Sequence, residues 1–206
     1  MGTTTMKCNK RNRQSRNRRG RGGYSFAEGL IALMIVLLVT NGMVAGVEFA
    51  MREYRESMIL SESRVLCSTL TDIINDELSN TPYVNPGKTP LRYFSHAFAK
   101  EGKAADGKGV CFISMVPNGN SESADGYGEI CVGYKKDDGS LDGAPTPVIS
   151  YSAYSSYHLT AKVEVDCDLE HSLFHVTLRI RPPYGEDMVT TFDVLSLYEL
   201  EEDPDL

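Results

Sequence analysis

The feature that most constrains this chain is an uncharged stretch of 19 residues, Gly29 to Val47, close to the N-terminus. As a helix, this stretch would cover about 28 Å, which is close to the hydrocarbon thickness of a bilayer. It is apolar on nearly every side, whereas a helix packed in a protein core usually keeps one polar face. The stretch therefore predicts a single transmembrane helix, around which the rest of the chain must be arranged.

Charge differs sharply on the two sides of this stretch. Residues 1–23 contain eight Lys and Arg side chains and no acidic one, whereas the remainder contains 13 basic and 28 acidic residues. Basic flanks of a membrane helix stay in the cytoplasm, so we expect a cytoplasmic N-terminus and an exported acidic body. The acidic body also argues against a nucleic-acid partner, because contacts to phosphates need basic groups.

The order of residues at the junction differs from that of a secretory signal, in which a small-residue cleavage site follows the apolar core. Here the small pair Gly22-Gly23 precedes the apolar run, so cleavage after Gly23 would leave the helix on the mature protein. Glu28 lies at the mouth of the run, where a charge is costly and often marks function. Cleavage would place the new α-amino group of Tyr24 about one helical turn from Glu28. Glu28 could then pair with this amine, or with the amine of a neighbouring subunit. Alternatively, Glu28 simply lies in the headgroup region.

This junction resembles the N-terminus of type IV prepilins and pseudopilins over roughly residues 18–50. The shared pattern is a short basic leader, a glycine before the cut, an aromatic residue, a hydroxyl residue, and a glutamate fifth after the cut. The resemblance implies that Gly23 is the cleavage-site residue, that Tyr24 becomes the N-methylated terminus, and that Glu28 is the assembly carboxylate. It also implies a filament with the helices in its core and the heads outside.

The resemblance further implies partners for this chain. A prepilin peptidase would process it, and other pilin subunits and an inner-membrane assembly platform would incorporate it into a surface filament or secretion pseudopilus. Before processing, its helix would contact membrane lipid. The variant motif and the large head favour a minor pilin or pseudopilin over a major subunit. Tyr24 replaces the usual phenylalanine of the family, and Phe26-Ala27 replaces the usual aliphatic pair.

From Glu48 the helical pattern continues with one apolar stripe. The stripe contains Leu60, Ser63, Cys67, Leu70, Ile74 and Leu78, broadened by Ile59, Leu66 and Ile73. The pairs Thr81-Pro82 and Pro86-Gly87 end the predicted helix. A continuous helix over residues 24–80 would be about 85 Å long. Within it, Gly42 and Gly46 allow three interpretations: a soft point, a close-packing face, or the ordinary frequency of glycine in membrane helices.

The body after residue 80 predicts antiparallel strands with one apolar face. Strands are expected at residues 110–116, 127–134, 157–165, 174–180 and 189–197, with turns at 135–146 and 166–171 and a frayed acidic tail at 199–206. Short connections between the last three strands favour an antiparallel meander, whose apolar face the helix stripe would cover. The predicted fold is therefore α+β and pilin-like, divided into a leader (1–23), an apolar helix (24–47), an amphipathic helix (48–80) and an exported head (81–206).

The four cysteines of the body allow two disulfides in an exported domain, with three possible connectivities. If residues 110–134 form a hairpin, Cys111 and Cys131 fall near each other, which would leave Cys67 of the helix to pair with Cys167. The alternative is that all four are small buried apolar residues. None has the spacing of a zinc site, so we expect no metal.

Catalytic patterns are absent from the sequence, and we predict a structural protein without enzymatic activity or cofactor. His171 and His175 are four residues apart but fall on a turn and a strand, so they do not form a helical metal-binding pair. Two other functions stay open. One is an uncleaved bitopic membrane protein with an exported ligand- or partner-binding domain. The other is an RNA-binding tail, residues 18–23, on a membrane anchor.

Overall fold

A computed structural model describes residues 25–97, 109–117, 119, 121–136, 139–204 and 206. The chain divides into two compact units, one reaching Ala50 and one covering Met51 to Leu206. The described part of the first unit belongs to helix α1, Phe26–Ser79, which agrees with the predicted helix to within two residues at each end. Side chains from Ser25 to Ser57 are all exposed.

The helix continues through the polar interruption at residues 40–42. The Thr40 hydroxyl donates a hydrogen bond of 2.7 Å to the Val36 carbonyl one turn earlier, so its polar group is satisfied within the helix. Gly42 and Gly46 have no atom within 4 Å of the place where a side chain would begin. The described residues therefore place nothing against these two glycines, which would admit a close neighbour.

The C-terminal part of α1 buries one stripe, formed by Ser63, Leu66, Cys67, Leu70, Ile74 and Leu78. This confirms most of the predicted stripe. Leu60 and Ile73 are exceptions, since they are 48% and 36% exposed. Leu60 lies one turn before the fully buried part of the helix and borders a groove beside Tyr184 and Met188.

Two sheets make up the rest of the second unit. The first has the order β5-β4-β3-β2-β1-β9 and the second the order β6-β7-β8. Their strands are β1 (Tyr83–Asn85), β2 (Arg92–Tyr93), β3 (Val110–Met115), β4 (Glu129–Lys135), β5 (Leu141–Pro147), β6 (Thr160–Asp168), β7 (Leu173–Arg181), β8 (Met188–Leu195) and β9 (Glu201–Glu202), with a short helix α3 (Ser152–Ser155) before β6. All pairings are antiparallel except β1 with β9.

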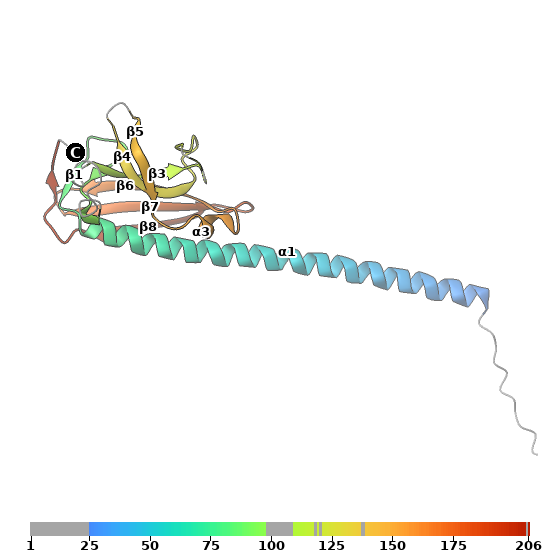
Figure 1. The fold of residues 1–206 in the computed structure, drawn as a ribbon. Coiled ribbons are helices and arrows are strands. Elements are labelled where there is room, and N and C mark those ends of the chain that lie inside the picture. Colours follow the sequence, from blue (N-terminus) through green and yellow to red (C-terminus); the bar gives the residue numbers. More distant parts are fainter. Residues whose placement is uncertain (1–24, 98–108, 118, 120, 137–138, 205) are drawn as a thin grey trace, which may run out of the picture. The chain divides into compact units, whose positions relative to one another are not determined.

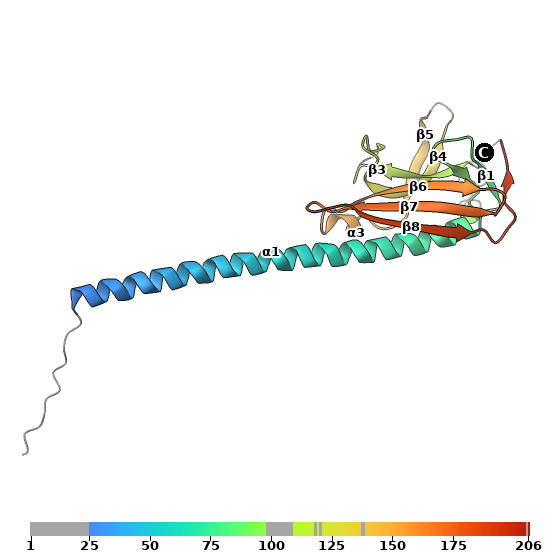
Figure 2. The same cartoon turned by 180° about the vertical axis from the view of Figure 1, so that it is seen from behind.

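The three-stranded sheet runs alongside the C-terminal part of α1, with β8 nearest the helix and β6 nearest the strands of the larger sheet (Figures 1 and 2). Strand β8 is next to the helix, where the Cys67 thiol meets the Thr190 hydroxyl at 3.3 Å. Strand β6 contacts both β3 and β4 on the other side. The expected antiparallel meander under the helix stripe is confirmed for β6, β7 and β8. The earlier strands form a separate sheet, which the chain leaves after β5 as it passes through α3.

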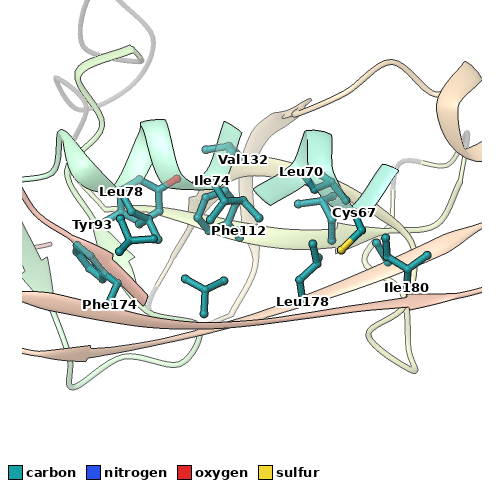
Figure 3. Close-up of a cluster of buried hydrophobic side chains, with 14 of the residues drawn as sticks. Cys67, Leu70, Ile74, Leu78, Tyr93, Phe112, Val132, Phe174, Leu178 and Ile180 are labelled. Carbon is teal, nitrogen blue, oxygen red and sulfur yellow. The ribbon is translucent and has the colours of Figure 1, made fainter. Parts of the chain in front are cut away.

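The main core forms where these layers meet. Figure 3 shows Cys67, Leu70 and Ile74 of α1 pointing toward Leu178 and Ile180 of β7. The other face of β3 and β4 carries a second buried cluster, made by Cys111, Ile113, Met115 and Cys131. Both faces of these two strands are thus buried, which explains why their sequences are apolar at nearly every position.

Two segments expected to be irregular are strands. Residues 135–146 were predicted as a turn, but residues 141–147 form β5. It is an edge strand among the described residues, so Pro145 and Pro147 are tolerated because no outer strand needs their missing N–H groups. The acidic tail was predicted to fray, but Leu200 and Leu206 are buried and residues 201–202 form β9. The Asn85 side chain holds the tail by donating to the carbonyls of Pro204 and Leu206, each at 3.2 Å.

Candidate functional site

The first turn of α1 is the candidate site that the sequence singled out. Ser25 immediately precedes the first helical residue, and its carbonyl accepts the first helical bond from the Gly29 N–H at 3.1 Å. The carboxylate of Glu28 turns back along the helix, and its Oε2 accepts a hydrogen bond from the Ser25 N–H at 2.9 Å. Serine at the cap with glutamate three residues later is the capping-box spacing, here with the glutamate half of the exchange formed.

This geometry gives Glu28 a local role that sequence reasoning missed. The signal was available, because Ser25-Phe26-Ala27-Glu28 fits the capping-box pattern. Four N–H groups at a helix start have no partner in the helix, and the helix dipole makes that end positive. A carboxylate there satisfies one donor and is stabilised by the dipole, typically by about 0.3–1 kcal/mol at an exposed site.

Gly23 and Tyr24, the predicted cleavage pair, lie outside the described residues. Ser25 is the first described residue, and the backbone N–H that Glu28 accepts is the one that directly follows Tyr24. Cleavage after Gly23 would therefore create an α-amine on the residue directly before Ser25. The Glu28 carboxylate is already turned toward that end of the chain.

The segment that follows this cap is a candidate membrane span. Helix α1 is long and apolar enough to cross a bilayer, and none of its most apolar 18-residue window is buried by other parts of the chain. It is the single helix with these properties in the part of the chain that the structure describes. Large apolar side chains from Phe26 to Phe49 are at least half exposed, and an apolar surface of this extent is typical of a membrane or protein interaction site.

The cysteines of the body are free thiols in this structure. Cys111 pairs across the strands with Gly133, and Cys131 pairs with Ile113, so the two cysteines are diagonal neighbours on one face of β3 and β4. Such neighbours have Cα atoms about 7–8 Å apart, at the limit of disulfide geometry. Burial raises the pKa of both thiols to about 11. A Cys111–Cys131 bridge stays a prediction, and forming it would require a shift of the backbone.

Cys67 and Cys167 are not brought together. Cys67 contacts Thr190 of β8. Thr190 pairs with Leu178 of β7, and Leu178 pairs in turn with Val163 of β6. Val163 is four residues from Cys167, or about 13 Å along the strand, and lies two strands away from Thr190. This separation is well beyond the reach of a disulfide, so the structure does not support the pairing that elimination suggested.

A groove that the sequence did not predict runs beside β6. It has a volume of about 580 Å³ and is lined by residues 162–167 of β6, 112–114 of β3 and 88–91 before β2, together with Pro86, Glu122 and Gly126. Periodicity identified β6 as a strand but could not show which of its edges would lie open. Among the described residues, no group of three His, Cys, Asp or Glu side chains is arranged to hold a metal ion.

No protein-family model, no curated protein and no solved structure matches this chain.

Proposed function

We propose that this chain is a structural subunit of the type IV pilin class, a minor pilin or pseudopilin, that is processed after Gly23 and assembled into a surface filament or secretion pseudopilus. The observation that carries the proposal is the junction at the start of α1. There, a carboxylate bonded to the Ser25 N–H lies in the first turn of a helix whose following apolar side chains are exposed.

Before processing, the basic arm of residues 1–23 retains the helix in the membrane with the head outside. Cleavage by a prepilin peptidase removes eight positive charges and creates an α-amino group at Tyr24. An α-amine has an ordinary pKa of about 7.7–8.0 and is mostly cationic at neutral pH. It is then a partner for Glu28, in the same subunit or in the next.

Pairing between subunits would fix the axial stagger of neighbouring helices, because an unpaired carboxylate among apolar helices is costly. The exposed apolar half of α1 would then leave lipid for a bundle of similar helices held by an assembly platform. Gly42 and Gly46, with open space around them, could admit a neighbouring helix closely.

The test is to express the full chain with a prepilin peptidase and to determine the N-terminal residue and the intact mass. We expect a mature chain that begins at Tyr24, with an added methyl group where the methyltransferase activity is present. Replacing Gly23 with a bulky residue is the matched control, which should block cleavage and leave membrane insertion unchanged. A chain that keeps residues 1–23 beside an active peptidase would contradict the proposal.

The competing function is an uncleaved bitopic membrane protein whose exported domain binds a ligand or partner. The groove beside β6 is the observation that favours it, since its volume lies within the usual range of binding sites, about 300–1,000 Å³. The same mass measurement separates the two, because this alternative requires the basic arm to remain attached.

A further inference from the structure

The outer edge of β6 carries backbone groups that have no hydrogen-bond partner among the described residues. Gly128 and Ala161 exchange two backbone hydrogen bonds, of 2.9 and 2.8 Å, on the side of β6 opposite to β7. In an antiparallel ladder, alternate residues direct their N–H and C=O groups to the same side. Val163, Val165 and Cys167 therefore direct theirs away from β7, where no hydrogen bond to another described residue meets them.

The ladder stops after one pair because the chain turns away. Gly126 has a φ of +74°, a conformation that glycine adopts without strain, and it ends a turn in which its N–H donates to the Ser123 carbonyl at 3.1 Å. The groove occupies the vacated space. Six consecutive residues of β6 line it, from both faces of the strand, so the groove follows the edge of the sheet and not one of its faces.

The floor and rim of the groove indicate what it would accept. Val163, Val165 and Leu91 pack against the main core and offer apolar surface on one side. On the other side of the edge, Glu164 and Asp166 present carboxylates to solvent, with Lys162 bonded to Glu164 at 2.8 Å. A strand added at this edge would therefore place apolar residues on one side and basic residues on the other.

Charge favours a basic strand over a second copy of this chain as the occupant. An antiparallel pairing of β6 with another β6 would put Glu164 opposite Glu164 or Asp166 of the partner copy in the central registers, and Lys162, opposite Asp166 or Asp168, would offset this repulsion. Like charges directly opposite each other destabilise a strand pair. Unpaired edges invite association, and the excess of acidic over basic residues on this side of β6 makes a basic strand the better electrostatic match.

We propose that the edge of β6 is a docking site for an extended polypeptide segment of a partner protein, with alternating apolar and basic residues, which adds a strand to the three-stranded sheet. Backbone groups of Val163, Val165 and Cys167 would supply the hydrogen bonds, and the alternation of side chains would supply selectivity. This inference concerns the head and does not depend on cleavage after Gly23.

The experiment measures amide hydrogen exchange in the full chain, in detergent, with a capped octapeptide of alternating valine and lysine as the probe. The control probe alternates valine and glutamate, so that strand propensity is equal and charge is reversed. We expect the lysine peptide to slow exchange at Val163, Val165 and Cys167, and the glutamate peptide to leave it unchanged. Equal effects of both peptides, or protection confined to another segment, would overturn the proposal.

Two sets of variants sharpen the test. Val165→Pro removes one outward N–H without removing a bond to β7, and should weaken binding about tenfold, whereas Val165→Ala keeps the N–H and should bind within a few-fold of the parent. Glu164→Lys combined with Asp166→Lys should reverse the preference toward the glutamate peptide. Because these charges are exposed, the double variant tests the site even where the proline variant fails to fold. An unchanged preference would contradict the proposed recognition.

Discussion

Arg181 lies over the aromatic ring of Tyr127, with its guanidinium carbon 3.4 Å from the ring centroid. The same guanidinium donates hydrogen bonds to Asp125 at 3.0 Å and to Asp187 at 3.3 Å, and the Tyr127 hydroxyl donates to Asp187 at 2.7 Å. This cluster joins the loop before β4 to the loop between β7 and β8. It thereby holds the loop that turns away from β6 and leaves the groove open.

Replacing Arg181 with lysine should loosen this loop. Lysine keeps the charge but loses both the planar contact with the ring and the fork of donors that reaches two carboxylates. We expect faster amide exchange at Tyr127 and Gly128, with little change in the main core. Arg179→Lys is the matched control, because its contact with Glu164 is long, at 3.9 Å, and exposed. Unchanged exchange in the Arg181 variant would show that the cluster does not restrain the loop.

Glu77 should make the head less stable at neutral pH than in mild acid. Its Oε1 is buried without a hydrogen-bond partner among the described residues, and burial raises the pKa of the carboxyl above 4.5, partly offset by a hydrogen bond with Ser95. A carboxyl whose pKa is raised on folding binds its proton more tightly in the folded state. Its contribution to stability is therefore complete below about pH 4.5 and is lost as the pH rises through the folded-state value.

Glu77→Gln is accordingly expected to raise the melting temperature at pH 7 and to flatten its dependence on pH above 4.5. The amide is neutral and can keep a hydrogen bond to Ser95. Thermal unfolding at several pH values measures this, with Asp72→Asn, an exposed site on the same helix, as the control. A lower melting temperature for the glutamine variant at pH 7 would show that the ionised form is satisfied in the fold.

Two substitutions at Glu28 separate its capping role from its proposed role in assembly. Glutamine retains an oxygen that can accept the Ser25 N–H bond but carries no charge, whereas alanine removes both. We expect both variants to be cleaved after Gly23 and both to enter filaments less efficiently than the parent, measured by immunoblotting of sheared filaments. Normal incorporation of Glu28→Gln together with a defect in Glu28→Ala would assign the effect to the cap and contradict the charge pairing.

Alkylation should distinguish the cysteines of the head. Because burial raises the pKa of Cys111 and Cys131 to about 11, both are almost fully protonated at pH 8 and shielded from reagents. Half-buried Cys167 lines the groove and should react first in the native protein. Peptide mass mapping after timed labelling measures this order. Native labelling of Cys111 as fast as Cys167 would contradict it, and a cross-linked Cys111–Cys131 peptide without reductant would establish the predicted bridge.

Much of the architecture could be predicted from local patterns. The change from all-round to one-sided apolarity near residue 48 predicted both the length of α1 and its buried stripe, because helical periodicity depends on neighbours three and four residues apart. The predicted bounds of β3, β7 and β8 lie within two residues of the observed bounds, because an apolar or alternating sequence directly indicates which residues are buried. Strand β6 continues through Asp166 and Asp168, which local turn propensity had assigned to a turn; pairing with β7 overrides that propensity.

Other parts depend on partners that are distant in the sequence. Strand β5 contains Gly143, Pro145 and Pro147, which oppose a strand locally, and it forms because β4 offers a complementary edge and a bulge near Gly133. Strand β9 forms because β1 is available to pair with it in parallel. Hydrogen bonds between backbones carry little sequence information, so neither strand leaves a clear pattern.

The sequence by itself determined the basic arm, the uncharged helix, the position of Glu28 at its mouth and the amphipathic stripe, because charge and hydropathy are properties of consecutive residues. Tertiary structure alone decided that the strands separate into two sheets, that Cys67 and Cys167 lie apart, and that the edge of β6 remains open beside a groove. These features arise from long-range pairing, in which a strand's neighbours and free edges are set by the path of the whole chain and not by its own residues.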